Sequence, residues 1–164
     1  MRFSGEHAKG AISGATLARR KQHADTTVIV NHAAAHCESR ETFKTILDGD
    51  ATGVFQGRIN VAPGAQKTDA RMSSNALLLS EGAAMYNKPE LEIFADDVQC
   101  AHGATCGELD QDLLFYIMAR GIPRREAEAL LLEAFVAPAF DGVEDETLRE
   151  TLMEKVRDWL AQRT

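Results

Sequence analysis

The chain has few cysteines and aromatic residues, and it contains no long apolar run. Its 3 cysteines are an odd number at irregular spacing, so free or metal-binding thiols in a reducing compartment fit better than a disulfide framework. No apolar stretch approaches the roughly 18 residues that a membrane-spanning helix needs. The first residues also lack the continuous apolar core of a signal peptide. These absences predict a cytoplasmic protein with no membrane partner.

Positive charge is also scarce, because 18 Lys and Arg face 25 Asp and Glu, for a net charge of -7. Nucleic-acid binding depends on clustered positive charge, so a nucleic-acid partner is not expected. The sequence has no G-x4-G-K-[ST] phosphate loop, no strand–GxGxxG–helix unit and no G-x-S-x-G elbow. Nothing therefore indicates nucleotide hydrolysis or hydride transfer by the chain itself, and we expect no enzyme.

The first two thirds of the chain consist of apolar runs broken by Gly, Asn and Asp. The clearest strands are expected at 26–32, 75–80 and 91–95, with a corner at Gly57. Residues 1–25 fit very short strands or a flexible lead-in, and 32–50 fit either a strand or a helix. Short, closely spaced strands suit a parallel β-solenoid or a jelly roll, and periodicity leaves that choice open.

The last third shows helical patterns. Helices are expected over 109–121, ending at Gly121, over 123–135, opening at Pro123, and from about Glu144 onward. The expected buried residues of the last two helices are Leu130, Leu131, Ala134, Phe135, Leu148, Leu152, Val156, Trp159 and Leu160. We therefore predict a β core over 1–108 and a helical domain over 109–164. The helices could cover the β body or dock a partner.

Three candidate metal ligands lie in one short segment, Cys100-x-His102-x3-Cys106. If a strand continues from Val98, the side chains of Cys100 and His102 point to one face. Thiolate and imidazole together suit zinc or iron–sulfur species. The alternative is structural: Cys100 would be a small buried apolar residue, and His102 would be held by backbone hydrogen bonds.

A second cluster is His32-x3-His36-Cys37, whose two histidines would share one face if they lay on a helix. A jelly roll that gathers His32, His36 and His102 around one metal would be a metal-dependent enzyme, and this is the alternative function. The simpler alternative to a metal site is that these histidines are structural residues and bind no metal.

Three segments carry a resemblance to a known family: GVFQGRINVAPGAQKTDARMSSNALLLS (53–80), KPELEIFADDVQCAHGAT (88–105) and LDQDLLFYIMARGI (109–122). Together they resemble the SufB/SufD family of iron–sulfur cluster assembly scaffolds, and within it the SufD branch. The resemblance implies a right-handed parallel β-helix followed by a C-terminal α-helical domain. It also implies that the chain corresponds to the C-terminal part of a longer protein.

The resemblance further implies a non-catalytic scaffold subunit of the Suf assembly complex. Such a subunit pairs with a SufB-like subunit through the β-helix and with a SufC-like ATPase through the C-terminal helices. Pairing with a second copy of itself is the other possibility. The residues implied for ATPase docking are Leu113, Leu114, Phe115, Tyr116, Arg120 and Gly121.

By its position in the C-x-HGAT motif, His102 is implied to lie at the subunit interface and to act in cluster assembly, with Cys100 as a second candidate. A transient iron–sulfur cluster or iron at that interface, bound through His102, is expected in place of a stable cofactor. Cys106 departs from the family pattern, which has an apolar residue there. It is an extra ligand or, as we favour, a small core residue.

Overall fold

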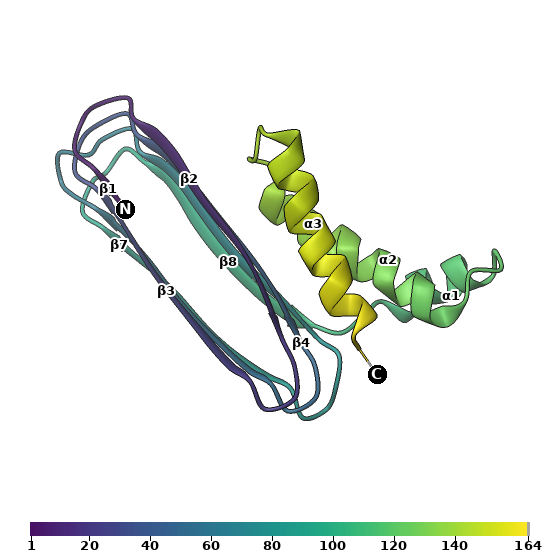
Figure 1. Cartoon of the computed structure of the whole chain (residues 1–164). Coiled ribbons are helices and arrows are strands. Elements are labelled where there is room, and N and C mark those ends of the chain that lie inside the picture. Colours follow the sequence, from purple (N-terminus) through teal and green to yellow (C-terminus); the bar gives the residue numbers. More distant parts are fainter. Residues whose placement is uncertain (164) are drawn as a thin grey trace.

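The structure, a computed structural model, describes residues 1–163, and the first two thirds of the chain wind into a solenoid of parallel strands (Figure 1). The strands are β1 (Arg2–Phe3), β2 (Lys9–Ala18), β3 (His23–His32), β4 (Glu38–Leu47), β5 (Thr52–Val61), β6 (Asp69–Leu78), β7 (Ala84–Ile93) and β8 (Gln99–Gly107). They form two 4-stranded sheets, ordered β1-β3-β5-β7 and β2-β4-β6-β8, that face each other across a narrow interior.

Successive turns of the solenoid lie in register. Lys9 pairs with Glu38, Glu38 with Asp69, and Asp69 with Gln99. Every ladder is parallel, so residues in the same row of neighbouring turns point to the same face. The predicted parallel β-helix followed by C-terminal helices is confirmed, and the jelly roll is wrong.

The strands are longer than the apolar runs indicated. Strands β2 to β7 each span 10 residues, and the ambiguous segment 32–50 contains strand β4. Their length is hidden because several inward positions are polar, namely Ser39, Glu41, Thr45 and Ser74, all of which are buried. Polar residues at inward positions break the alternation of apolar and polar side chains by which a half-buried strand is recognised.

Gly57 lies in the middle of β5, and the predicted corner there is wrong. A Cβ at this position would lie 2.2 Å from Sδ of Met72 and 2.8 Å from Cε1 of Phe55. Glycine is therefore required because side chains from both sheets fill the narrow interior at this point.

A buried acid lies among the apolar side chains of the interior. Glu41 is 1% exposed, and neither of its carboxylate oxygens has a hydrogen-bond partner. Burial raises the pKa of Glu41 to about 7. Nearby, Nε2 of the buried His32 lies 3.0 Å from Oγ of Ser39, and burial lowers the pKa of His32. Both groups thus favour their neutral forms inside the solenoid.

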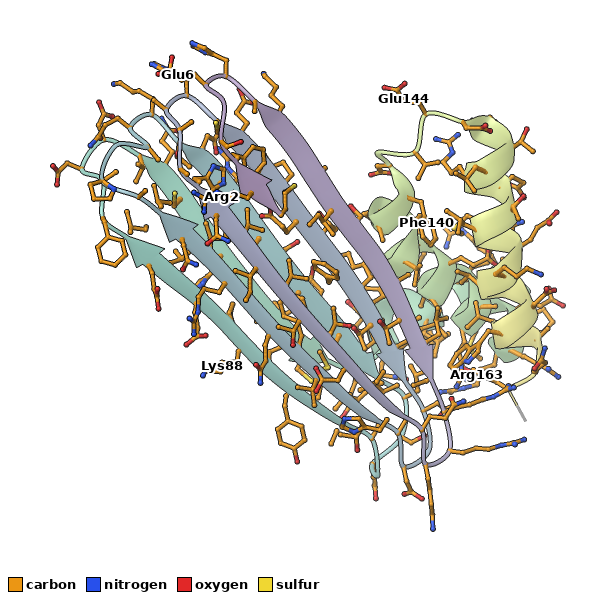
Figure 2. All side chains as sticks on the ribbon, turned by 60° about the vertical axis from the view of Figure 1, so that its left-hand side comes forward. Arg2, Glu6, Lys88, Phe140, Glu144 and Arg163 are labelled. Atoms are coloured by element: carbon orange, nitrogen blue, oxygen red, sulfur yellow. The ribbon has the colours of Figure 1, made fainter. Side chains whose placement is uncertain are left out.

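Three α-helices and a short 3-10 segment follow the strands: α1 (Gln111–Met118), α2 (Arg124–Val136), η1 (Ala137–Phe140) and α3 (Glu146–Ala161). Segments α2, η1 and α3 pack on the outer face of the β2-β4-β6-β8 sheet, where the side chain of Phe140 points into the space between sheet and helices (Figure 2), while α1 packs against α2. The buried residues of this second core are Ile46, Leu132, Val136, Ala139, Phe140, Val156 and Leu160. Within residues 1–163, no helix is both long enough and apolar enough to cross a membrane.

Three details of the helix prediction are corrected. Leu130, Ala134 and Leu148 were expected to face the core but are exposed, Leu130 and Leu148 by 49% and 51%. On α2 the buried positions are Ala127, Leu132 and Val136. Helix α2 turns this face inward because it packs against both the sheet and α3. A single apolar stripe in the sequence does not show that a helix has two packing partners.

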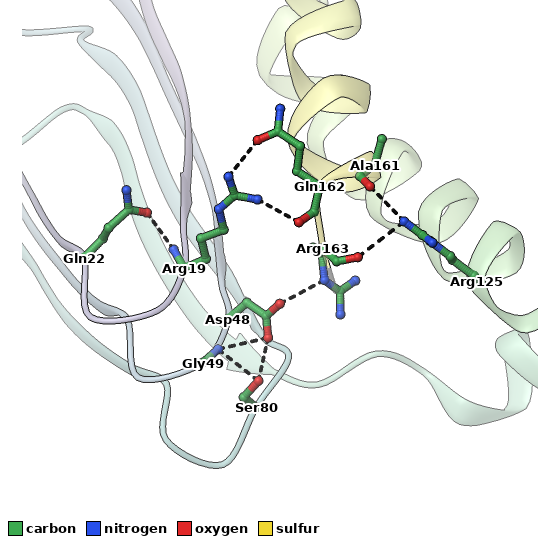
Figure 3. A network of polar contacts seen from close by, with 9 residues as sticks. All are labelled: Arg19, Gln22, Asp48, Gly49, Ser80, Arg125, Ala161, Gln162 and Arg163. Atoms are coloured by element: carbon green, nitrogen blue, oxygen red, sulfur yellow. Dashed lines mark hydrogen bonds and ion pairs between the residues drawn. The ribbon is translucent and has the colours of Figure 1, made fainter.

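A polar network holds the end of α3 against the solenoid (Figure 3). The Arg163 side chain donates to Asp48 at 3.0 Å, and Arg19 donates to both the backbone and the side chain of Gln162. Asp48 also accepts from the Ser80 hydroxyl and the Gly49 N–H. Burial alone would raise the pKa of Asp48, but these hydrogen bonds and the charge of Arg163 lower it.

Replacing Glu41 by Gln tests the buried acid. The pKa of Glu41 is higher in the folded chain than in the unfolded chain, so this carboxyl loses folding stability as the pH rises from about 4.5 to about 7. At pH 8, Glu41→Gln should raise the free energy of unfolding by up to about 3 kcal/mol, with little change at pH 5. Urea denaturation at both values measures this. The control is Glu38→Gln, on the outer face of the same strand. A gain at both pH values would contradict the prediction.

Replacing Asp48 by Asn tests the anchor of α3. Losing the charged acceptor should lower the free energy of unfolding by about 1–3 kcal/mol at neutral pH. The difference should shrink in acid, because stability from a carboxylate with a lowered pKa is lost as the pH falls through that pKa. Denaturation followed by fluorescence of Trp159, which lies on α3, measures the effect. Asp50→Asn, an exposed acid in the same turn, is the control, and an equal loss there would contradict the prediction.

Candidate functional site

Strand β8 closes the solenoid at one end and leaves an edge free. It pairs with β6 on one side, and among residues 1–163 no strand pairs with its other edge. The nine residues from Gln99 to Gly107 include no Asp, Glu, Lys, Arg or Pro. Natural proteins usually protect exposed edges with such residues. The free edge of β8 therefore has the properties of a strand that pairs with another chain.

The inward row of β8 carries the three candidate ligands. Cys100 pairs in register with Ala70, His102 with Met72, and Cys106 with Ala76, and all three β6 residues are buried in the interior. The predicted common face of Cys100 and His102 is confirmed. Because no further turn covers this row, His102 and Cys106 are exposed and Cys100 is half-buried. The favoured interpretation of Cys106 as a core residue is therefore wrong.

The inward row of β8 offers soft metal ligands on a strand that has no charged side chains. Burial raises the pKa of the Cys100 thiol, and the nearby charge of Asp69 acts in the same direction. Within this chain the Cys100 thiol therefore stays protonated at neutral pH until a metal or another positive group is near. His102 supplies an imidazole beside it, two residues along the same face.

Within one chain the row offers too few ligands to enclose a metal. Cys106 lies four residues from His102, which is about 13 Å along an extended strand. Among residues 1–163, no group of three or more His, Cys, Asp or Glu is arranged to hold a metal ion. Any metal or cluster bound by Cys100 and His102 therefore needs ligands from a second chain or from the solution.

The other histidines do not join this row. His32 is buried at the end of β3 and stacks on Phe3, with ring centroids 4.5 Å apart. His36 is exposed in the following turn and stacks on His7, at 4.7 Å. The predicted shared face of His32 and His36 is wrong, because the segment is a strand end and a turn instead of a helix. The proposed metal centre of His32, His36 and His102 is therefore wrong as well.

Helix α1 carries a second candidate surface. Leu113, Phe115 and Tyr116 are 52%, 73% and 57% exposed. The guanidinium of Arg120 lies 3.5 Å from the centroid of the Tyr116 ring, and Gly121 ends the helical segment with a φ of 86°. Leu114 is 2% exposed, so it holds α1 in place and is not available for docking.

Sequence reasoning missed part of both surfaces. Met118 and Leu130 are also exposed apolar residues of the helices. The signal for α1 was present, since six apolar residues in succession cannot all face inward on an eight-residue helix. For β8, the sequence signal was the uncharged stretch 99–107, which indicates an unprotected edge strand and was read only for metal ligands.

Comparison with known proteins assigns the family. Residues 1–135 match the model of the SUF system FeS cluster assembly, SufBD core domain. The chain is 36% identical over 154 residues to the iron–sulfur cluster assembly protein SufD of Escherichia coli, covering 94% of this chain and 36% of that protein. It is 35% identical to a SufBD family protein of Synechocystis, covering 92% of this chain and 33% of that protein. The chain thus spans about a third of the length of these relatives, and it belongs to the SufB/SufD family of iron–sulfur cluster assembly proteins.

Proposed function

We propose that the chain acts as part of a non-catalytic, SufD-like scaffold subunit, together with a SufB-like subunit and a SufC-like ATPase. The observation that carries the proposal is the position of Cys100 and His102 on the inward row of an unpaired, uncharged strand. Two soft ligands at a free edge make half of a site, and a partner that pairs with the edge supplies the other half. The free thiols of all 3 cysteines support the cytoplasm as the compartment.

Pairing with the SufB-like subunit would occur through β8. A strand of the partner would extend the β2-β4-β6-β8 sheet and satisfy the free backbone groups of its last strand. The inward row of β8 would then be enclosed between two solenoid ends. A second copy of this chain could use the same edge.

His102 would act at that shared interior. An imidazole can bind iron or move a proton during cluster assembly, and the Cys100 thiol would be a second ligand. Iron, or a cluster in assembly, is here the cargo of the complex and is held transiently.

The ATPase would dock on α1. Leu113, Phe115 and Tyr116 form an exposed apolar surface of the kind that marks a protein interface. Large aromatic residues dominate binding energy at such surfaces, and an arginine beside them adds a directed contact. Arg120, stacked on Tyr116, fits that pattern.

Replacing His102 by Ala in the full-length subunit tests the assembly site. The complex should form normally, because the backbone edge is unchanged, while cluster assembly falls about a hundredfold or more, the scale on which losing one proton-transferring group slows a reaction. Co-purification measures complex formation, and iron–sulfur enzyme activity in cells measures cluster assembly. Gln99→Ala, at the exposed start of the same strand, is the control. Normal cluster assembly with His102→Ala would refute the role.

Replacing Phe115 by Asp tests the docking surface. The change should weaken ATPase binding by roughly 30-fold or more, which is the scale of an interface hot spot. Isothermal titration of the purified ATPase into the subunit measures the affinity. Phe94→Asp is the matched control, since Phe94 is 65% exposed in the turn after β7, away from the helices. Equal weakening by both variants would count against α1 as the docking site.

A further inference from the structure

We propose that a groove between strand β2 and helix α3 binds a free long-chain fatty acid, with the acyl chain inside the groove and the carboxylate at its open end. The groove is a hollow of about 700 Å³, which is within the range of small-molecule sites in proteins. Among residues 1–163, neither β8 nor α1 contributes to its lining. The inference therefore goes beyond the proposed function and concerns a different part of the molecule.

The floor of the groove is the outer face of β2, where Ala11, Ser13 and Ala15 have small side chains. The residues in the same rows of the neighbouring strand β4 are larger: Arg40, Thr42 and Lys44. The hollow therefore follows β2. Its lining on this strand extends from Ala11 to Leu17, which is about 20 Å along an extended strand. A long, narrow floor suits a single extended acyl chain.

Helix α3 covers this floor with one apolar face. Leu152, Val156 and Trp159 line the groove at intervals of three and four residues, and Phe140 and Val143 line it from the segment before the helix. Apolar groups therefore face one another across a recess, and methylene groups placed between them would leave water. A membrane is instead bound by apolar side chains that protrude from a surface, so a free fatty acid is the occupant that fits.

One end of the groove is closed. Helix α3 and strand β2 approach each other toward their C-terminal ends (Figure 1). There Arg19 donates to the backbone and the side chain of Gln162 (Figure 3). The Arg19 guanidinium also lies 5.9 Å from the centroid of the Trp159 ring. The tail of the fatty acid would end here, against Leu17 and Trp159.

Lys155 supplies a positive charge one turn of α3 nearer to the open end. It is the one charged side chain that lines the groove among residues 1–163. Its ammonium lies 3.8 Å from the Asp158 carboxylate, and the side chain is 76% exposed. The ammonium can therefore turn toward a second carboxylate at the rim while its apolar stem covers the acyl chain.

The sheet beside the open end also carries excess positive charge. Arg40 is in register with Ala11, one strand spacing of about 4.8 Å away. Arg40 and Arg71 share the single carboxylate of Asp69, although the whole chain has a net charge of -7. Local positive charge of this kind attracts an anionic head group. Charge complementarity thus favours a fatty acid over a neutral or cationic amphiphile.

Tryptophan fluorescence tests the site with the purified chain, because Trp159 is its one tryptophan. Bromine quenches tryptophan on contact, so 12-bromododecanoate, which carries bromine at its tail, should quench the emission below its micelle concentration. Unlabelled dodecanoate should restore the emission by competition. Decanoate should compete about tenfold less well, because two methylene groups fewer are buried. Dodecyltrimethylammonium, which has a positive head, should compete at least tenfold less well than dodecanoate.

A filled groove tests the position. Ser13→Phe places a ring on the floor and should weaken 12-bromododecanoate binding at least tenfold. Ser73→Phe is the matched control, since Ser73 lies in the same row two strands away and outside the groove. Lys155→Gln should weaken binding about threefold, the scale of one exposed ion pair. Circular dichroism checks that the variants fold, and the chain-length series needs no variant.

The proposal is overturned if 12-bromododecanoate leaves the emission unchanged, if the cationic amphiphile competes as well as dodecanoate, or if a folded Ser13→Phe chain binds like the unaltered one. Quenching only by brominated lipid in phosphatidylglycerol vesicles would assign the groove to a membrane and would also overturn it. None of these results bears on His102 in cluster assembly, which the cellular test decides separately.

Discussion

The structure depends on one constraint: each turn of the solenoid satisfies the backbone hydrogen bonds of the turn before it. Within a stack of parallel strands this leaves no polar backbone group unpaired except at the ends. The last strand, β8, therefore has a free edge and an uncovered inward row. The same geometry that buries Ala70 and Met72 exposes His102 one turn further on. The candidate site is thus a consequence of where the stack stops.

Stacking also explains why the interior tolerates polar residues. Backbone ladders hold the turns together. Stacked inward side chains must therefore match in shape from one turn to the next, and their polarity matters less. Ser39, Ser74 and Thr45 are buried, and the Ser74 hydroxyl finds a partner across the interior in Asn87. Glu41 is the exception, since its carboxyl has no partner and favours the neutral form. Its neighbours along the row, Ile12 and Met72, offer no polar group.

The sequence predicted the fold class mainly through its resemblance to a family, and the strand boundaries only in part. Runs such as 26–32 marked β3 correctly, but Gly57 and the polar inward residues of β4 concealed ten-residue strands. The shared face of Cys100 and His102 followed from period-2 alternation alone. The exposure of Cys106 and the burial of Leu114 could not follow from any local pattern. Both depend on which neighbours a strand or helix has, and those neighbours are distant in sequence.

The link between β8 and α1 has a mechanical consequence. Only Glu108, Leu109 and Asp110 separate the end of the strand from the start of the helix, and the Asp110 carboxylate caps α1 by accepting from the N–H groups of Asp112 and Leu113. Such a short, capped connection has no slack, because three residues reach at most about 10 Å. A force that tilts α1 would therefore be transmitted directly to Gly107 and to Cys106 beside it, at the end of the terminal strand.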